Sequence, residues 1–128
     1  MSRNDEARAF HFAVYETVQQ IPEGRVTTYG HIAKLVLRPR NSRQVGQALK
    51  LLPNGDSSEY PFSIVNVPWW RVISSAGVIS PRRPQDMRRQ KEMLEREGVN
   101  VLENNKIRLS SYGWFPDTEF DDNDSDSN

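Results

Sequence analysis

Two adjacent tryptophans, Trp69 and Trp70, are the residues best suited to bind a flat ligand in this chain of 128 residues. On an extended strand, neighbouring side chains point to opposite faces, so at most one of the two belongs to an ordinary core. The other is expected to be exposed or to line a pocket. The alternative is that both tryptophans simply pack inside the protein.

Residues that act as nucleophiles or metal ligands are scarce. The chain has no cysteine and two histidines, His11 and His31. It therefore has no disulfide, no thiolate metal site and no cysteine nucleophile. A histidine-based metal site is also disfavoured, since two histidines are too few for most such sites. The sequence predicts no metal and no cofactor.

Charge is divided unevenly along the chain. The 17 basic and 17 acidic residues cancel, but six of the acids and none of the bases lie in residues 117–128. Residues 1–116 therefore carry 17 bases and 11 acids, a net charge of +6. A basic domain is typical of a nucleic-acid binder. The alternative is that the net charge only keeps the domain soluble. We expect one folded domain over 1–116 and an acidic, disordered tail over 117–128.

The chain carries no sign of a membrane or secretory segment. It contains no run of 18 apolar residues, and its first residues, MSRNDEARAFHF, have no apolar stretch of the secretory kind. We therefore expect an intracellular protein that is not secreted and has no membrane partner.

Upstream of the tryptophans, apolar positions at helical spacing predict three helices. The first covers about residues 4–20. The second begins at Thr27 or Thr28, whose hydroxyl can accept from free backbone N–H groups. The third covers 43–52. A short basic turn joins the second helix to the third, and this arrangement is typical of a helix-turn-helix.

The remaining pattern predicts shorter elements on both sides of the tryptophans. We expect a surface loop, a strand, a helix and a hairpin at residues 53–66, 71–73, 84–97 and 99–109. A hairpin that follows a helix-turn-helix is a wing. The sequence therefore predicts a mainly α fold with short strands (α+β), a winged helix-turn-helix DNA-binding domain.

The tryptophan segment resembles the active-site motif of O6-alkylguanine-DNA alkyltransferases, Pro-Cys-His-Arg-Val, which reads Pro68-Trp69-Trp70-Arg71-Val72 here. Several motifs in order are far more specific than one. Further family motifs follow the same order over about residues 10–110, namely Ile21-Pro22 with Gly24-Arg25-Val26, Thr28-Tyr29-Gly30 with Ile32-Ala33, Arg43-Gln44-Val45-Gly46 with Ala48, Ser75 with Gly77, and Leu94 with Glu97-Gly98-Val99.

The departures from the family motif concern its chemistry. Trp69 stands in place of the cysteine nucleophile and Trp70 in place of the histidine that activates it. Glu97 matches the family's glutamate, and we expect it to have no residue left to orient. Because tryptophan is neither a nucleophile nor a base, alkyl transfer by the family mechanism is excluded.

A tryptophan in place of the cysteine resembles the alkyltransferase-like proteins, which bind O6-alkylguanine without repairing it. The resemblance implies a non-enzymatic protein that flips the lesion out of double-stranded DNA and marks it for nucleotide excision repair proteins. It also implies a monomer in the nucleus, or in the cytoplasm or nucleoid of a bacterium. The usual members keep the histidine where Trp70 stands here. The loop at 53–66 looks long for the family, and the acidic tail looks like an addition.

The resemblance assigns DNA contacts to the predicted helix-turn-helix. It places Arg43 in the minor groove, where the guanidinium would fill the gap left by a flipped base. Tyr29 would press the phosphate beside the lesion and help to rotate the nucleotide. Thr28, Ser42 and Gln44 are further candidates for contacts with the DNA backbone.

The resemblance also assigns a lesion pocket. Trp69 would form one wall, and Trp70 would add a second wall or pack inward. The backbone carbonyls of Trp69 and Val72 would accept from the guanine amino group. Arg82 would lie against the alkylated base. Because Arg83 follows directly, either of the two arginines could occupy this position of the family. The alternative is that both arginines are solvated surface residues.

Two other functions compete with lesion binding. A winged-helix transcription regulator would read undamaged sequence in the major groove, but it leaves the adjacent tryptophans unexplained. A hydrolase or glycosylase would use Glu97 or an aspartate, but no paired carboxylates occur at helical spacing near Trp69. The sequence therefore favours a protein that recognises O6-alkylguanine and does no chemistry on it.

Overall fold

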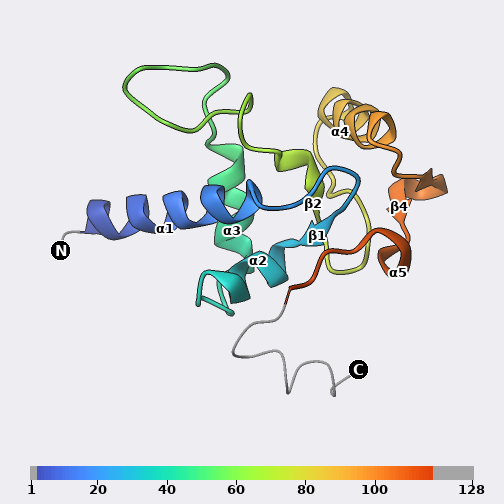
Figure 1. Cartoon of the computed structure of the whole chain (residues 1–128), viewed down its shortest axis with the longest axis horizontal. Helices are drawn as coiled ribbons and strands as arrows, with labels where there is room; N and C mark the ends of the chain where they lie inside the picture. The colour runs from blue at the N-terminus through green and yellow to red at the C-terminus, as the bar shows by residue number, and fades with distance from the viewer. Residues whose placement is uncertain (1–2, 117–128) are drawn as a thin grey trace.

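The computed structural model describes residues 3–116, which fold into short helices and two small sheets (Figure 1). The predicted tail, residues 117–128, lies outside the described part. In chain order, the elements are α1 (Arg3–Val18), β1 (Thr27–Thr28), α2 (Tyr29–Leu35), α3 (Ser42–Lys50), the 3-10 turn η1 (Trp69–Arg71), β2 (Val72–Ile73), α4 (Pro84–Arg96), β3 (Val101–Leu102), the 3-10 turn η2 (Glu103–Asn105), β4 (Lys106–Ile107) and α5 (Leu109–Tyr112).

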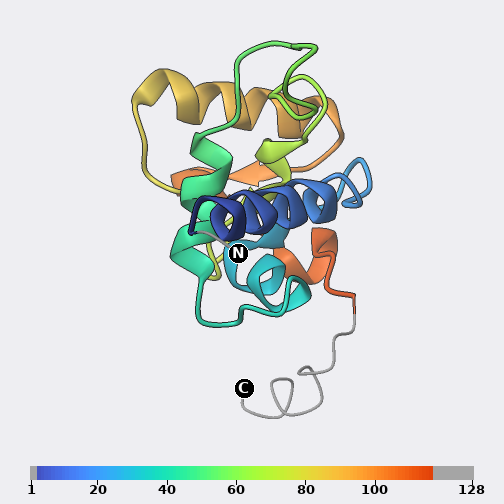
Figure 2. The same ribbon diagram turned by 90° about the vertical axis from the view of Figure 1, so that its left-hand side faces the viewer.

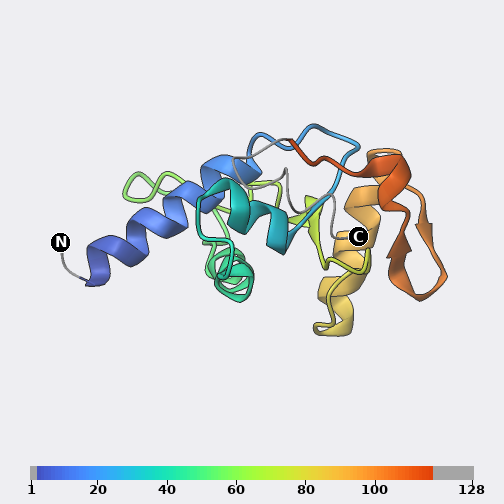
Figure 3. The same ribbon diagram turned by 90° about the horizontal axis from the view of Figure 1, so that it is seen from below.

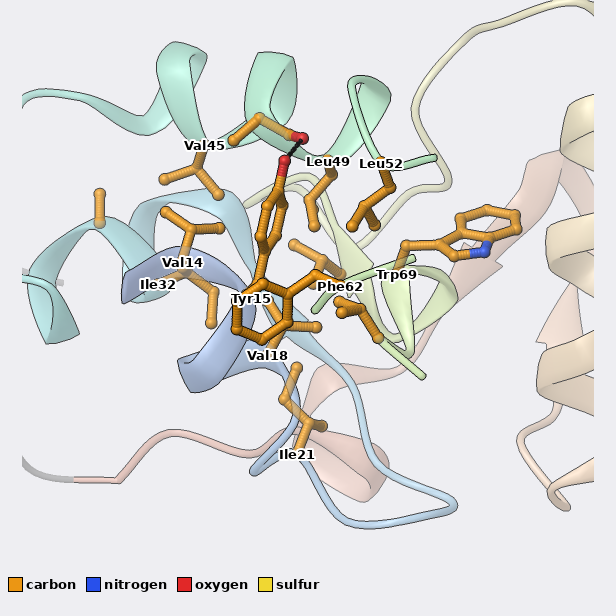
Figure 4. Packing of buried hydrophobic residues seen from close by; sticks show 14 residues of the cluster. Val14, Tyr15, Val18, Ile21, Ile32, Val45, Leu49, Leu52, Phe62 and Trp69 are labelled. Atoms are coloured by element: carbon orange, nitrogen blue, oxygen red, sulfur yellow. Dashed lines mark hydrogen bonds between the residues drawn. The ribbon is translucent and has the colours of Figure 1, made fainter. Parts of the chain in front are cut away.

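Helices α1, α2 and α3 pack together around the first hydrophobic cluster. Tyr15 lies at the centre of this cluster, and its hydroxyl donates to the carbonyl of Ala48 at 2.6 Å (Figure 4). Burial, together with the nearby Tyr60, holds the pKa of Tyr15 well above its ordinary value, so the hydroxyl stays a donor. This hydrogen bond fixes α3 relative to α1, and α3 carries several of the residues predicted to contact DNA.

The start of α2 follows the sequence prediction. The hydroxyl of Thr28 accepts from the backbone N–H of His31 at 3.1 Å, which caps the helix. Thr27 and Thr28 also form β1, which pairs in parallel with β2 in the register Thr27 to Val72 and Thr28 to Ile73. The capped helix α2 therefore begins directly beside the tryptophan segment.

The tryptophan segment differs from the predicted strand at 71–73. Only Val72 and Ile73 are extended, and the tryptophans lie on the helical turn η1. The rings of Trp69 and Trp70 meet edge to face, with their centroids 5.9 Å apart. Trp69 is only 9% exposed, and Figure 4 shows it at the edge of the first cluster.

A second hydrophobic cluster holds α4 and the β3–β4 hairpin at the other end of the molecule (Figure 3). The hairpin is antiparallel, pairs Val101 with Ile107, and is shorter than the predicted 99–109. Asn104 and Asn105 turn it with φ angles of 64° and 60°, a conformation that asparagine tolerates better than most residues. These elements confirm the mainly α fold with short strands.

The loop after α3 projects from the molecule (Figure 2) on the side of α1, away from α4 (Figure 1), and it is anchored at its far end. Phe62 is 7% exposed and packs in the first cluster, and its ring lies 5.0 Å from that of Phe12 on α1. Tyr60 adds a second edge-to-face contact with Phe12 at 5.5 Å. The predicted surface loop at 53–66 is therefore tied to α1, and this places its later residues near Trp69.

None of the helices within residues 3–116 has the length and apolar character that crossing a membrane requires.

Candidate nucleic-acid interface

Arg82 links two residues that come from distant parts of the chain. Its guanidinium carbon lies 5.5 Å from the ring centroid of Trp69, which is a cation–π contact. Its Nη2 donates to the hydroxyl of Tyr29 at 3.3 Å. Its Nε is buried and has no hydrogen-bond partner within the described residues. The Nε of Arg82 is thus a hydrogen-bond donor without a partner beside the indole of Trp69. A polar, planar ligand can replace the weak contacts that Arg82 makes with Trp69 and Tyr29.

The neighbouring Arg83 lies in a different environment. Its side chain is 75% exposed and pairs with Asp86 at 3.1 Å, one turn along the start of α4. Of the two arginines that the sequence left undecided, Arg82 is therefore the one that contacts Trp69.

A groove of about 510 Å³ runs beside Tyr29 along α3. Ser42, Arg43, Gly46 and Lys50 line it from α3, and Arg82 lines it from the opposite side. Arg43 is exposed at the first turn of α3, where free backbone N–H groups also favour a phosphate. The groove thus presents cations, a phenol and helix amides to the same space.

Two of the predicted backbone contacts lie elsewhere. Thr28 is 6% exposed, and its hydroxyl already caps α2. Gln44 is exposed but lines a separate groove between α1 and α3. The structure therefore brings Tyr29, Ser42 and Arg43 together and leaves Thr28 and Gln44 out of this groove.

A cavity of about 470 Å³ adjoins the groove on the far side of Arg82, and Trp69 forms part of its wall. Lys50, Pro81 and Arg82 line both spaces, so the cavity and the groove meet at these residues. The cavity has the size of a small-molecule site, since such sites usually measure about 300–1,000 Å³.

Trp70 points away from the cavity and toward Glu97. Its indole Nε1 donates to the Glu97 carboxylate at 2.9 Å, and Arg71 forms an ion pair with the same carboxylate at 2.6 Å. The backbone N–H of Gly24 donates to it at 3.0 Å. The expectation that Glu97 has no residue to orient is therefore wrong, because this carboxylate joins three segments of the chain.

The environment of Glu97 favours its charged form. Burial by itself raises the pKa of the carboxyl, but the hydrogen bonds from Arg71, Gly24 and Trp70 and the charge of Arg71 outweigh it. The net pKa is lowered from its ordinary value of 4.5. Glu97 is thus a permanently ionised structural anchor at neutral pH, and Trp70 is one of its donors.

The family assignment rests on sequence as well as on this geometry. The model of the 6-O-methylguanine DNA methyltransferase, DNA-binding domain, matches residues 9–99. The chain belongs to this family. The resemblance that the motifs indicated is therefore confirmed.

Among individual members of the family, the chain is similar to two named proteins and to one crystal structure with DNA. The chain is 43% identical over 107 residues to the DNA base-flipping protein of Vibrio parahaemolyticus, covering 84% of this chain and 97% of that protein. It is also 43% identical over 112 residues to alkyltransferase-like protein 1 of Schizosaccharomyces pombe, with coverage of 84% and 95%. The crystal structure of S. pombe Atl1 with damaged DNA containing O6-carboxymethylguanine superposes with a TM-score of 0.72 at 40% identity, covering 91% and 100% of the two chains.

The chain differs from the alkyltransferases of this family in the reactive residues of its site. It contains no cysteine, so it has no thiol to accept an alkyl group. Within residues 3–116, no group of three or more His, Asp or Glu side chains is arranged to hold a metal ion. The site offers aromatic surface and hydrogen-bond donors, which suit binding of a base.

Gln90 is a site residue that sequence reasoning missed. It is fully buried, and its Nε2 donates to the carbonyls of Trp70 at 3.0 Å and Val72 at 3.2 Å. The Val72 carbonyl, which the resemblance assigned to the guanine amino group, thus already has one donor. The signal was present, since Gln90 lies three residues after Met87 and four before Leu94, on the inner face of α4.

Proposed function

We propose that this protein binds O6-alkylguanine in double-stranded DNA, rotates the modified base into the cavity beside Trp69, and leaves the alkyl group in place. The contact of Arg82 with both Trp69 and Tyr29, in a chain without cysteine, carries the proposal. The names of the relatives, a base-flipping protein and an alkyltransferase-like protein, support it.

The groove beside Tyr29 is suited to hold the DNA backbone. Arg43 is exposed at the start of α3 and can enter a DNA groove, where its planar guanidinium stacks between bases. Tyr29 lines the same groove and can press a phosphate. Together they would offset the few kcal/mol that flipping a base costs, a cost that is smaller for a weakened pair.

The cavity is suited to hold the flipped base. Trp69 lines the cavity and offers base–aromatic contact, worth about 1–3 kcal/mol. Arg82 brings a cationic face and an unused Nε donor. In binding, the base would replace the contact between Arg82 and Trp69, and the arginine would then lie against the base.

The protein is proposed to do no chemistry on the lesion. The family's histidine is replaced by Trp70, whose N–H donates to Glu97 and which has no lone pair to accept a proton. A lesion that stays in the DNA must be removed by other proteins. We therefore propose nucleotide excision repair proteins as partners, a monomeric binding unit, and a location in the nucleus, or in the nucleoid of a bacterium.

The test is a titration of the protein into labelled duplexes that contain guanine or O6-methylguanine, at several salt concentrations, with mass analysis of the recovered DNA. A tenfold preference for the lesion, about 1.4 kcal/mol, with an unchanged DNA mass supports the proposal. Equal affinities for the two duplexes would reject lesion recognition. Loss of the methyl group from the DNA would reject binding without chemistry.

A further inference from the structure

The cavity beside Trp69 is larger and more positively charged than a methyl adduct requires. On the proposed function, which this inference extends, a flipped guanine would lie against Trp69 and Arg82. The remainder of the cavity then faces the group attached to the guanine oxygen. We propose that this part binds anionic adducts, so that the protein prefers O6-alkyl groups that end in a carboxylate over neutral groups of the same size.

The wall next to Trp69 is apolar. Leu49, Leu52 and Ile64 line the cavity there, and the first two are each 6% exposed. Ile64 comes from the loop that Phe62 anchors to the first cluster. These side chains suit the carbon atoms of an alkyl chain, because removing apolar surface from water favours binding.

The outer lining is cationic. Lys50, Arg83 and Arg89 line the cavity in addition to Arg82, and Asp86 is the one acid in the lining. The carboxylate of Asp86 pairs with Arg83, at 3.1 Å. Within residues 3–116, neither Lys50 nor Arg89 forms an ion pair, so their charges are not compensated.

These charges come from two elements that face the same space. Lys50 ends α3, and Arg89 lies in the second turn of α4. A carboxylate placed between them can accept charge-assisted hydrogen bonds, which are roughly twice as strong as neutral ones. An amide of the same shape offers one carbonyl oxygen and no negative charge, so it gains less from the same cations.

The same cations could instead hold a phosphate of the DNA backbone. Such a contact would strengthen binding to every duplex alike and would not depend on the adduct. The ratio of affinities for a charged and a neutral adduct of the same shape separates the two roles, because any contact with phosphate cancels in that ratio.

The experiment uses four duplexes of one sequence, containing guanine, O6-methylguanine, O6-carboxymethylguanine or its neutral amide, O6-carbamoylmethylguanine. We expect the carboxymethyl duplex to bind at least fivefold more tightly than the carbamoylmethyl duplex, at low salt and neutral pH. In the double variant Lys50→Gln/Arg89→Gln, this ratio should fall to about one. The control Arg96→Gln, which removes a charge from α4 outside the cavity lining, should keep the wild-type ratio.

The other possible results reject either the anionic-adduct site or lesion recognition itself. A ratio of one in the wild-type protein, with all three lesions bound more tightly than guanine, rejects the anionic site and keeps the proposed function. The double variant could instead bind all four duplexes more weakly by the same factor and keep the ratio between the carboxymethyl and carbamoylmethyl duplexes. That result would mean that Lys50 and Arg89 contact a DNA phosphate, and it rejects the anionic-adduct site. If all three modified duplexes bind like guanine, lesion recognition itself is rejected. Circular dichroism of each variant establishes that it is folded.

Discussion

The guanidinium of Arg82 lies over the indole of Trp69 and donates to the hydroxyl of Tyr29, so one side chain joins the proposed base site to the proposed phosphate site. Tyr29 and Trp69 come from segments forty residues apart, which the β1–β2 pairing brings together. This arrangement means that a base entering beside Trp69 must disturb a contact made by Tyr29. Binding of the base and binding of the neighbouring phosphate are therefore expected to depend on each other.

The first prediction concerns Arg82. In Arg82→Ala, we expect the preference for O6-methylguanine over guanine to fall at least tenfold, because the base loses its cationic partner and Trp69 loses its cation–π contact. Fluorescence titration with both duplexes measures the effect. Arg88→Ala is the matched control, since this exposed arginine of α4 does not line the cavity. An unchanged preference in Arg82→Ala would show that Arg82 does not read the lesion.

The second prediction separates two neighbours on α3. Arg43 lines the groove beside Tyr29, whereas Gln44 lines the groove between α1 and α3. We expect Arg43→Ala to weaken binding to O6-methylguanine DNA by tenfold or more and to reduce its salt dependence. Gln44→Ala should change the affinity less than twofold. The reverse order would mean that DNA lies on the other side of α3.

The third prediction concerns Gly46, in the middle of α3. A Cβ added there would meet the ring of Tyr29 at 3.7 Å, which is an ordinary contact. Gly46→Ala should therefore stabilise the free protein by about 1 kcal/mol, the helix propensity difference. The added methyl group projects into the groove where we place DNA, so affinity for DNA should fall. Thermal unfolding and titration measure the two effects, and a variant that binds as tightly as the wild type would place the DNA backbone farther from α3.

The helices around the site follow from local sequence, and so they could be predicted. The hydroxyl of Thr28 caps α2, and Pro84 begins α4, because both effects act within one turn of a helix. The helical turn at Trp69 and Trp70 was missed because β2 pairs only through Val72 and Ile73, with a partner more than forty residues upstream. A short strand of this kind depends on tertiary contacts that no local pattern contains.

In the candidate site, too, some features could be predicted from the sequence and others depend on tertiary contacts. The family motifs predicted Tyr29, Arg43 and Trp69 as site residues, because residue type and order suffice for such an assignment, and they left Arg82 and Arg83 as alternatives. They did not reveal the partners of Glu97, because its hydrogen bonds join residues separated by 26 to 73 positions. Which of two adjacent arginines contacts Trp69 also needed the structure, because the path of the chain before α4 decides it.

The fourth prediction concerns the ion pair between Glu97 and Arg71, whose side chains are 11% and 13% exposed. Because the pKa of Glu97 is lowered in the folded protein, its contribution to stability is present above the ordinary value of 4.5 and is lost as the pH falls. Glu97→Gln should destabilise the protein by about 3 kcal/mol at neutral pH, as expected for breaking a buried pair. The difference from wild type should shrink below about pH 4.5. Chemical denaturation at several pH values measures it, and a difference independent of pH would contradict the proposed role of the charge.

The fifth prediction asks whether the family chemistry can be rebuilt on this chain. Trp69→Cys alone should transfer no methyl group, because an unassisted thiol has a pKa near 8.5 and Trp70 cannot take its proton. The double variant Trp69→Cys/Trp70→His places an imidazole where the indole now donates to Glu97, and it should accept a methyl group slowly. Removing the nearly buried Trp69 costs about 3–5 kcal/mol, so folding is verified by circular dichroism.

Protein mass after incubation with O6-methylguanine DNA measures this transfer. The control is the double variant carrying Glu97→Gln as well, which keeps the thiol and the imidazole but removes the carboxylate that orients the ring. We expect it to transfer more slowly than the double variant, because the imidazole loses the partner that fixes its orientation and stabilises its protonated form. Transfer by Trp69→Cys alone at the rate of the double variant would show that the residue at position 70 does not decide whether this site does chemistry.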